Sequence, residues 1–137
     1  MRIPRLLTAT AAICVLIGAG ISCGDSTEPP VAGAVTVSLV TPNTDDGAVA
    51  VTITGPGLNA LVSVTTSYEV FWRLVSETEV RALVFGNLTA GPLVTVNVSD
   101  LNQLASIAGA VTEVAQRNDE LRSDLSGYAI TVAGPSQ

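Results

Sequence analysis

The chain has 137 residues, of which 12 are acidic and 6 are arginine, so its formal net charge is −6, and it contains neither lysine nor histidine. The lack of these two residue types excludes histidine acid–base catalysis, lysine nucleophiles and the most common metal ligand. The acidic balance also argues against nucleic-acid binding, which needs clustered cations to neutralise phosphates.

The N-terminal region has the order of an export signal. A basic start precedes an apolar run over residues 6–21, which is shorter than the roughly 20 apolar residues of a membrane-spanning helix. Cys23 stands behind this run and before a polar, proline-containing stretch over residues 24–30. The arrangement resembles the lipobox of bacterial lipoproteins, in which Ile21 and Ser22 occupy the two positions before the cysteine.

The resemblance implies that residues 1–22 form a helical signal peptide and that Cys23 becomes the lipidated first residue of the mature protein. Gly24 rather than aspartate follows the cysteine, which favours the outer membrane or cell surface. Gly20 departs from the large aliphatic residue usual at its position. Two alternatives stay open: ordinary signal cleavage, which leaves a soluble secreted protein, and an uncleaved N-terminal anchor.

Cleavage before Cys23 leaves a mature chain that must fold without disulfides. Cys23 is then its only cysteine, and the mature chain contains twelve acidic residues and four arginines. Residues 23–33 predict a flexible tether because they are small, polar and proline-containing. Residues 34–137 predict one domain that depends on its hydrophobic core.

Beyond the tether, apolar and polar residues alternate in short runs separated by turn residues, which predicts strands. The apolar positions of these runs are Val35, Val37 and Leu39; Val49, Val51 and Ile53; Leu58, Ala60, Val62 and Val64; Tyr68, Val70, Trp72 and Leu74; Val80, Ala82 and Val84; Val94, Val96 and Val98; Tyr128, Ile130 and Val132. Residues 100–108 predict a short helix that Asp100 caps and Gly109 ends. Residues 110–116 fit strand or helix, and the need for pairing partners favours strand.

The pattern predicts an all-β fold, a two-sheet antiparallel sandwich of about seven or eight strands with one short helix. Residues 124–128, Asp-Leu-Ser-Gly-Tyr, resemble the tyrosine corner of immunoglobulin-like domains. This resemblance implies an immunoglobulin-like or cohesin-like sandwich in which the Tyr128 hydroxyl bonds to nearby backbone. Tyr128 opens the last strand, whereas the motif normally precedes one strand more.

An acidic turn over residues 42–47 holds the candidate calcium ligands. Asn43, Asp45 and Asp46 offer amide and carboxylate oxygens, the donors that calcium prefers. The alternative is turn chemistry alone, because an Asp-Gly pair is typical of hairpins. No other metal site is predicted, and the charged residues 117–124 predict a solvated loop in which arginines compensate carboxylates.

The only tryptophan, Trp72, and its neighbour Phe71 point to opposite faces of a predicted strand. Val70 and Leu74 share the parity of Trp72, which favours a buried Trp72 and leaves Phe71 exposed as a candidate ligand contact. In the reversed register, Trp72 is the exposed residue.

Neither a nucleophile–base pair nor a phosphate-binding glycine loop occurs in the sequence, so we expect a non-enzymatic protein without a cofactor. We expect a lipid-anchored protein of the bacterial cell envelope with a binding or structural sandwich domain, whose partner is an envelope protein or a glycan. A carbohydrate-binding or adhesin module and a soluble secreted assembly subunit are the alternatives.

Overall fold

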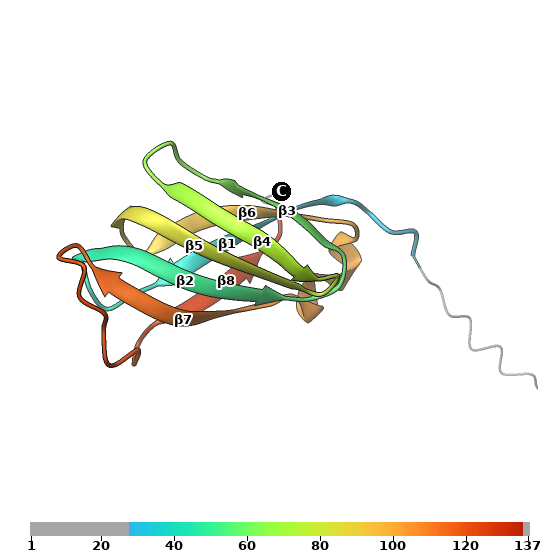
Figure 1. Ribbon diagram of the computed structural model, residues 1–137. Coiled ribbons are helices and arrows are strands. Elements are labelled where there is room, and N and C mark those ends of the chain that lie inside the picture. Colours follow the sequence, from blue (N-terminus) through green and yellow to red (C-terminus); the bar gives the residue numbers. More distant parts are fainter. Residues whose placement is uncertain (1–27, 136–137) are drawn as a thin grey trace, which may run out of the picture.

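The computed structural model describes residues 28–135; the predicted signal peptide and the lipidation site Cys23 lie outside them. Its elements are β1 (Gly33–Val40), β2 (Asp46–Thr54), β3 (Leu58–Ser63), β4 (Glu69–Ser76), β5 (Glu79–Leu88), β6 (Gly91–Val98), the 3-10 helix η1 (Leu101–Ser106), β7 (Ala108–Gln116) and β8 (Ala129–Ala133). The strands form two four-stranded sheets, ordered β3-β6-β1-β8 and β4-β5-β2-β7, in which all pairings are antiparallel (Figure 1). The predicted two-sheet sandwich with one short helix is confirmed.

Two strands exchange places relative to an immunoglobulin constant domain, in which the first strand lies beside the second and the seventh beside the sixth. Here β1 pairs with β6 and β7 pairs with β2, while β8 occupies the other side of β1. Consecutive strands β1 and β2 therefore belong to different sheets. The turn between them crosses one end of the sandwich and brings Asp46 there.

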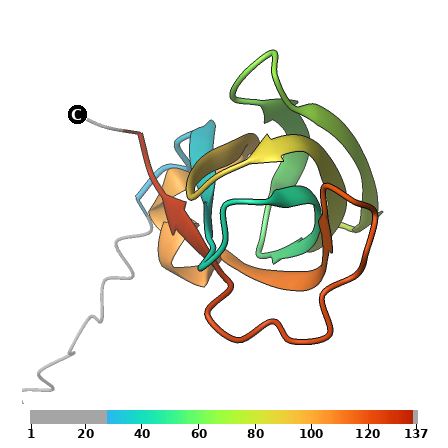
Figure 2. The same cartoon turned by 90° about the vertical axis from the view of Figure 1, so that its left-hand side faces the viewer.

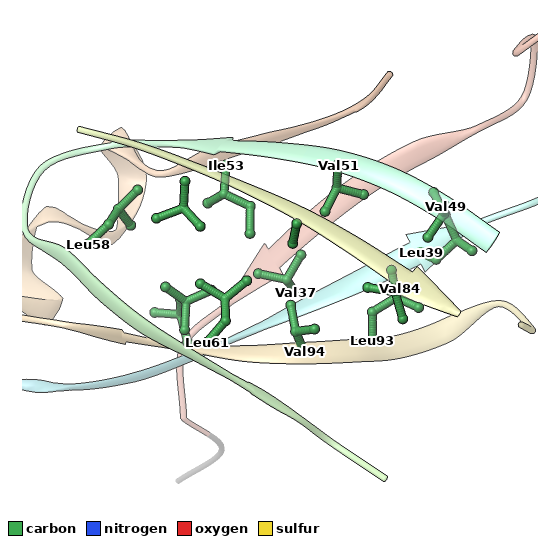
Figure 3. Packing of buried hydrophobic residues seen from close by; sticks show 14 of the residues in the cluster. Val37, Leu39, Val49, Val51, Ile53, Leu58, Leu61, Val84, Leu93 and Val94 are labelled. Carbon is green, nitrogen blue, oxygen red and sulfur yellow. The ribbon is translucent and has the colours of Figure 1, made fainter. Parts of the chain in front are cut away.

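The core lies between the inner faces of the two sheets, whose arrangement is seen end-on in Figure 2. Alternation predicts its membership in β1, β2, β5 and β6, because every second side chain of a strand points to the same face. The confirmed positions, none more than 5% exposed, are Val35, Val37, Leu39, Val49, Val51, Ile53, Val80, Ala82, Val84, Val94, Val96 and Val98. Figure 3 shows core side chains of both sheets, Val37 and Val51 among them, packed between the sheets.

β3 departs from the predicted alternation. Leu58 and Leu61 are buried, whereas Val62 is 57% exposed, so the prediction that Val62 faces the core is wrong. The pairing of β3 with β6 shifts register between Leu58 and Leu61. An extra residue in one strand moves all later side chains to the opposite face.

β4 is the edge strand of its sheet and pairs with β5 alone. Trp72 follows the inward parity, opposite the buried Ala82, yet it is 40% exposed, so its predicted burial is wrong. An edge strand has a neighbouring strand on one side only. A large ring such as that of Trp72 can therefore point toward the interior and still be partly exposed. Phe71, on the other face, is 57% exposed, as the sequence predicts.

The predicted helix is the 3-10 helix η1. The Asp100 carboxylate caps it by accepting a hydrogen bond from the Asn102 amide at 3.0 Å, as predicted. The helix ends at Ser106 and β7 begins at Ala108, so the prediction that Gly109 ends the helix is wrong, whereas the strand favoured for residues 110–116 is confirmed.

The described end of the predicted tether is held against this helix. The Val31 amide donates to Asp100 Oδ1 at 3.1 Å, the Leu101 amide donates to the Val31 carbonyl at 2.7 Å, and the Asn102 side chain donates to the Pro29 carbonyl at 3.1 Å. Within the described residues, the contacts of the domain therefore begin at Pro29 rather than at Ala34. Asp100, which caps the helix, also accepts the hydrogen bond from Val31, and the composition of the tether does not predict this contact.

Candidate ligand-binding face

The solvent side of the β4-β5-β2-β7 sheet carries three large apolar side chains. Phe71 is 57% exposed, and Leu83 and Phe85 are each 37% exposed. Phe71 lies opposite Leu83 in the pairing of β4 with β5, and its ring centroid is 6.0 Å from that of Phe85 in an edge-to-face arrangement. Contiguous exposed apolar side chains of this kind mark interaction surfaces in soluble domains.

Apolar residues occupy both faces of β5 from Ala82 to Phe85, which explains this exposed apolar surface. Val80, Ala82 and Val84 fill the core, and the alternate positions Leu83 and Phe85 point to solvent. An antiparallel sheet with one solvated face normally places polar residues at such positions. Leu83 and Phe85 are therefore two large hydrophobic residues at positions where they do not contribute to the core.

Small residues continue this surface across the sheet. Ala50 lies opposite Leu83, Ala48 lies opposite Phe85, and Ala115 of β7 lies opposite Ala48. Because the side chain of Ala50 is short, a shallow hollow of about 390 Å³ lies beside Phe71 and Leu83. We call the surface formed by six residues the aromatic face: Phe71, Leu83, Phe85, Ala48, Ala50 and Ala115.

Charged side chains border the hollow. Arg73, Arg81 and Glu113 line it together with Phe71 and Leu83. Arg81 forms an ion pair with Glu79, with 2.7 Å between Nε and Oε1, and Arg73 lies directly opposite Arg81. The site thus combines an apolar floor with donors and one carboxylate at its rim, an arrangement suited to binding.

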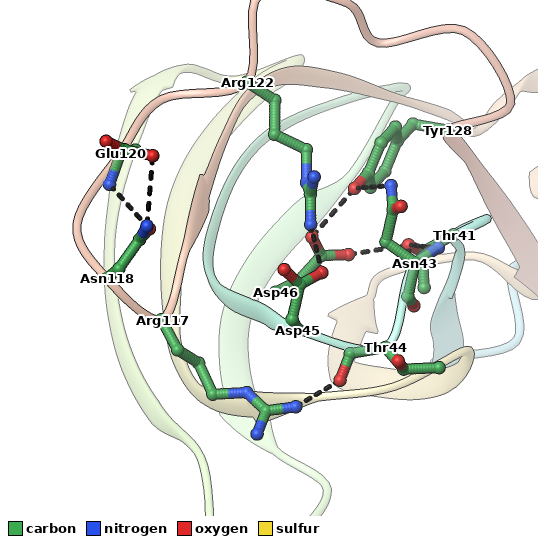
Figure 4. A network of polar contacts seen from close by, with 10 residues as sticks. All are labelled: Thr41, Asn43, Thr44, Asp45, Asp46, Arg117, Asn118, Glu120, Arg122 and Tyr128. Atoms are coloured by element: carbon green, nitrogen blue, oxygen red, sulfur yellow. Dashed lines mark hydrogen bonds and ion pairs between the residues drawn. The ribbon is translucent and has the colours of Figure 1, made fainter.

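A polar network lies at the end of the sandwich where β2 begins (Figure 4). The Asp46 side chain is fully buried. Its Oδ2 accepts a hydrogen bond from the Thr41 hydroxyl at 2.6 Å, and its Oδ1 accepts from Tyr128 Oη at 2.8 Å and Arg122 Nε at 2.7 Å. Within residues 28–135, every buried side-chain nitrogen and oxygen has a hydrogen-bond partner.

This network sets the ionisation of Asp46. Burial by itself raises the pKa of the carboxyl, but hydrogen bonds from Thr41, Tyr128 and Arg122 and the charge of Arg122 favour the ionised form. Together they hold the pKa of Asp46 below its ordinary value. Asp46 is therefore a buried, paired carboxylate that stabilises the fold.

The candidate calcium ligands are used in these contacts. Asp45 forms an ion pair with Arg122, and Asn43 donates from Nδ2 to Tyr128 Oη at 2.8 Å. In the described part of the chain, acidic and cysteine residues form no group of three or more that could hold a metal ion. The oxygens of Asp46 face protein donors, a guanidinium among them, rather than an open coordination shell.

The prediction of a solvated loop over residues 117–124 is wrong for Arg122. Its side chain is only 14% exposed, and its amide donates to the Val114 carbonyl at 2.9 Å. Leu121 pairs with Ala115 at the end of β7, so this part of the segment returns along that strand. Arg122 pairs with the buried carboxylate of Asp46, whereas the sequence predicted that it would pair with carboxylates of its own loop.

The tyrosine-corner interpretation is also corrected. The Tyr128 hydroxyl donates to the Asp46 side chain, 82 positions away in the chain, and not to nearby backbone. Tyr128 lies one residue before β8 rather than at the predicted first position of the strand, and its amide donates to the Leu125 carbonyl at 3.1 Å. The residue thus connects the last strand to the start of β2 through a side-chain acceptor.

Sequence reasoning selected Phe71 but missed Leu83 and Phe85. Leu83 and Phe85 alternate with the core residues of β5 in the same way as the charged Arg81, which points to solvent. The alternation alone could therefore have predicted that both are exposed. The sequence offers no comparable signal for the pairing of Asp46 with Arg122. Such a pairing depends on how the sheets are connected.

Comparisons with known proteins add no family: no family model, curated protein or solved structure matches this chain. Among residues 28–135, no helix is long and apolar enough to cross a membrane.

Proposed function

We propose that this protein is a lipid-anchored protein of the bacterial cell envelope whose β-sandwich is a non-catalytic, protein-binding module. The order of the N-terminal residues around Cys23 supports the anchor. The aromatic face supports the binding role and carries the proposal, because Phe71 and Phe85 contact one another on the solvent side of a sheet. The lack of histidine and lysine favours a role without catalysis.

Mass spectrometry of the mature N-terminus tests the anchor. We expect a chain that begins at Cys23 and carries added acyl mass. The variant Cys14→Ser should keep this mass, whereas Cys23→Ser should lose it. An unmodified N-terminus at another residue would contradict the anchor and favour a soluble secreted assembly subunit.

Site-specific crosslinking tests the binding face. A photoreactive amino acid replaces Leu83 on the aromatic face, or Val62, which is 57% exposed on the other sheet and serves as the control. In cells that express the full chain, we expect a defined crosslinked protein from position 83 and none from position 62. Equal crosslinking from both positions, or none from either, would remove the aromatic face as the binding surface.

A carbohydrate-binding or adhesin role is the second candidate. The observation that favours it is the position of Phe71 beside Arg73, Arg81 and Glu113 in one hollow. A sugar ring can stack on the phenyl ring while charged groups at the rim accept and donate hydrogen bonds. Binding to a glycan array that Phe71→Ala abolishes and Val62→Ala preserves would support this role; no binding to any envelope glycan would eliminate it.

A further inference from the structure

β4 has an open edge that is unprotected over most of its length, from Glu69 to Leu74. Exposed edge strands are normally short, bulged, covered, or interrupted by proline or lysine, because their free backbone groups can pair with another strand. β4 has eight residues with neither proline nor lysine. Its pairing with β5 is regular from Glu69 to Leu74, and its register shift lies at the end of the strand, between Leu74 and Ser76.

The other three edges are protected. β3 carries a register shift, and β8 has only five residues. β7 carries register shifts in its pairing with β2, and Leu121 pairs with Ala115 at its end. Among the strands of the described residues, β4 is therefore the edge with the longest regular stretch, from Glu69 to Leu74.

Both faces of β4 carry apolar side chains that are incompletely covered. Trp72 and Leu74 point toward the interior but are 40% and 48% exposed, and Phe71 and Val75 are 57% and 44% exposed. A strand of this kind, next to the open edge, presents backbone donors and acceptors together with apolar side chains. These are the elements of strand addition, in which an incoming strand extends a sheet.

The charges of β4 complement a second copy of the same strand. Glu69 and Arg73 stand two positions on either side of Phe71, and they share its face. When two β4 strands pair antiparallel with Phe71 at the centre, Glu69 of each copy lies opposite Arg73 of the other. Opposite charges in directly facing positions stabilise such a pair.

In the single chain these charges lack such partners. Within residues 28–135, neither Glu69 nor Arg73 takes part in a salt bridge. Arg73 lies directly opposite Arg81, a like charge that is unfavourable at this position. A second copy would place a carboxylate on the open side of Arg73.

We propose that two copies of this protein associate through their β4 edges, antiparallel and centred on Phe71, to form one continuous eight-stranded sheet. The association is isologous, with the same strand on both sides of a two-fold axis. Val70 of each copy lies opposite Trp72 of the other, which covers the exposed indole. This inference does not depend on what binds the aromatic face.

Disulfide trapping in the full chain tests the register. Phe71→Cys places two thiols opposite one another at the two-fold axis, and Val62→Cys is the control, because both native side chains are 57% exposed and both lie on edge strands. We expect a covalent dimer from Phe71→Cys under mild oxidation and none from Val62→Cys. Equal yields from the two variants would overturn the proposal, as would a crosslink of Phe71→Cys to a different protein in place of itself.

Charge reversal provides a second test that does not alter Phe71. With two differently tagged full chains, Glu69→Arg alone or Arg73→Glu alone should reduce co-purification by about tenfold, because each variant sets like charges against one another. Mixing Glu69→Arg with Arg73→Glu should restore association, since the two altered strands are complementary. Folding of each variant is checked by circular dichroism, and a mixture that associates no better than each variant alone would overturn the proposal.

Discussion

The Arg122 guanidinium donates from Nε to Asp46 Oδ1 at 2.7 Å, although the two residues lie 76 positions apart. The Asp46 side chain is fully buried and that of Arg122 is 14% exposed. Thr41 and Tyr128 donate to the same carboxylate. One charged group therefore connects the turn before β2, the segment after β7 and the start of β8.

Removing this carboxylate should destabilise the domain strongly. Asp46→Ala leaves the guanidinium of Arg122 and two hydroxyl groups without their acceptor, and we expect a loss of about 3 kcal/mol in the free energy of unfolding. Urea denaturation followed by circular dichroism measures it. Asp45→Ala is the control: the Asp45 side chain is 56% exposed, so its ion pair should contribute less than about 1 kcal/mol. Equal losses in the two variants would contradict a structural role specific to Asp46.

The stability of the domain should fall in acid through Asp46. Because the pKa of Asp46 is lower in the folded state, its stabilisation is complete above the unfolded-state pKa near 3.8 and is lost as the pH falls through the folded-state pKa. Since the sequence has no histidine, stability should stay nearly constant between about pH 5 and 8. Urea denaturation at a series of pH values measures both regions. Asp46→Asn should be less stable at neutral pH and should lose less stability below pH 3.8 than the unaltered protein; an unchanged acid slope would assign the effect to other carboxyls.

Periodicity predicted the parts of the fold that depend on local pattern. Val35, Val37 and Leu39, like the alternating residues of β2, β5 and β6, are buried because a period of two fixes the face to which each side chain points. That argument fails where the ladder is irregular. The bulge in β3 exposes Val62, and only the pairing with β6 reveals it.

Contacts between distant segments could not be predicted. The Asp46–Arg122 pair requires that β1 and β2 lie in different sheets and that the chain returns along β7, and composition contains neither fact. The aromatic face could be predicted in part. Phe71 follows from parity, but its contact with Phe85 depends on the register between β4 and β5.

Gly109 should be intolerant of any side chain, because β7 and β8 approach each other closely at this residue. An added Cβ would contact Cγ2 of Ile130 and lie 2.9 Å from its Cβ. We expect Gly109→Ala to lower the free energy of unfolding by about 2 kcal/mol. Urea denaturation of the single and double variants checks this. The double variant Gly109→Ala/Ile130→Ala should lose less free energy of unfolding than the sum of the two single losses, by at least about 0.5 kcal/mol.

Gly134→Ala is the matched control for this prediction. Its added Cβ would lie 3.1 Å from the terminal Cδ2 of Leu104, a side-chain end that can move. Its effect should therefore be smaller than that of Gly109→Ala. Strict additivity of Gly109→Ala and Ile130→Ala would contradict the proposed clash.

Trp72 should contribute less to stability than Ile53, a smaller residue in the core. Ile53 is fully buried, whereas Trp72 is 40% exposed on an edge strand. We expect Ile53→Ala to cost about 3 kcal/mol, because it leaves a cavity between the two sheets, and Trp72→Ala to cost about 1 kcal/mol. Urea denaturation at dilute protein concentration measures both without a contribution from association. A larger loss for Trp72→Ala would mean that the indole is part of the core, as the alternation of residues 70–74 alone suggests.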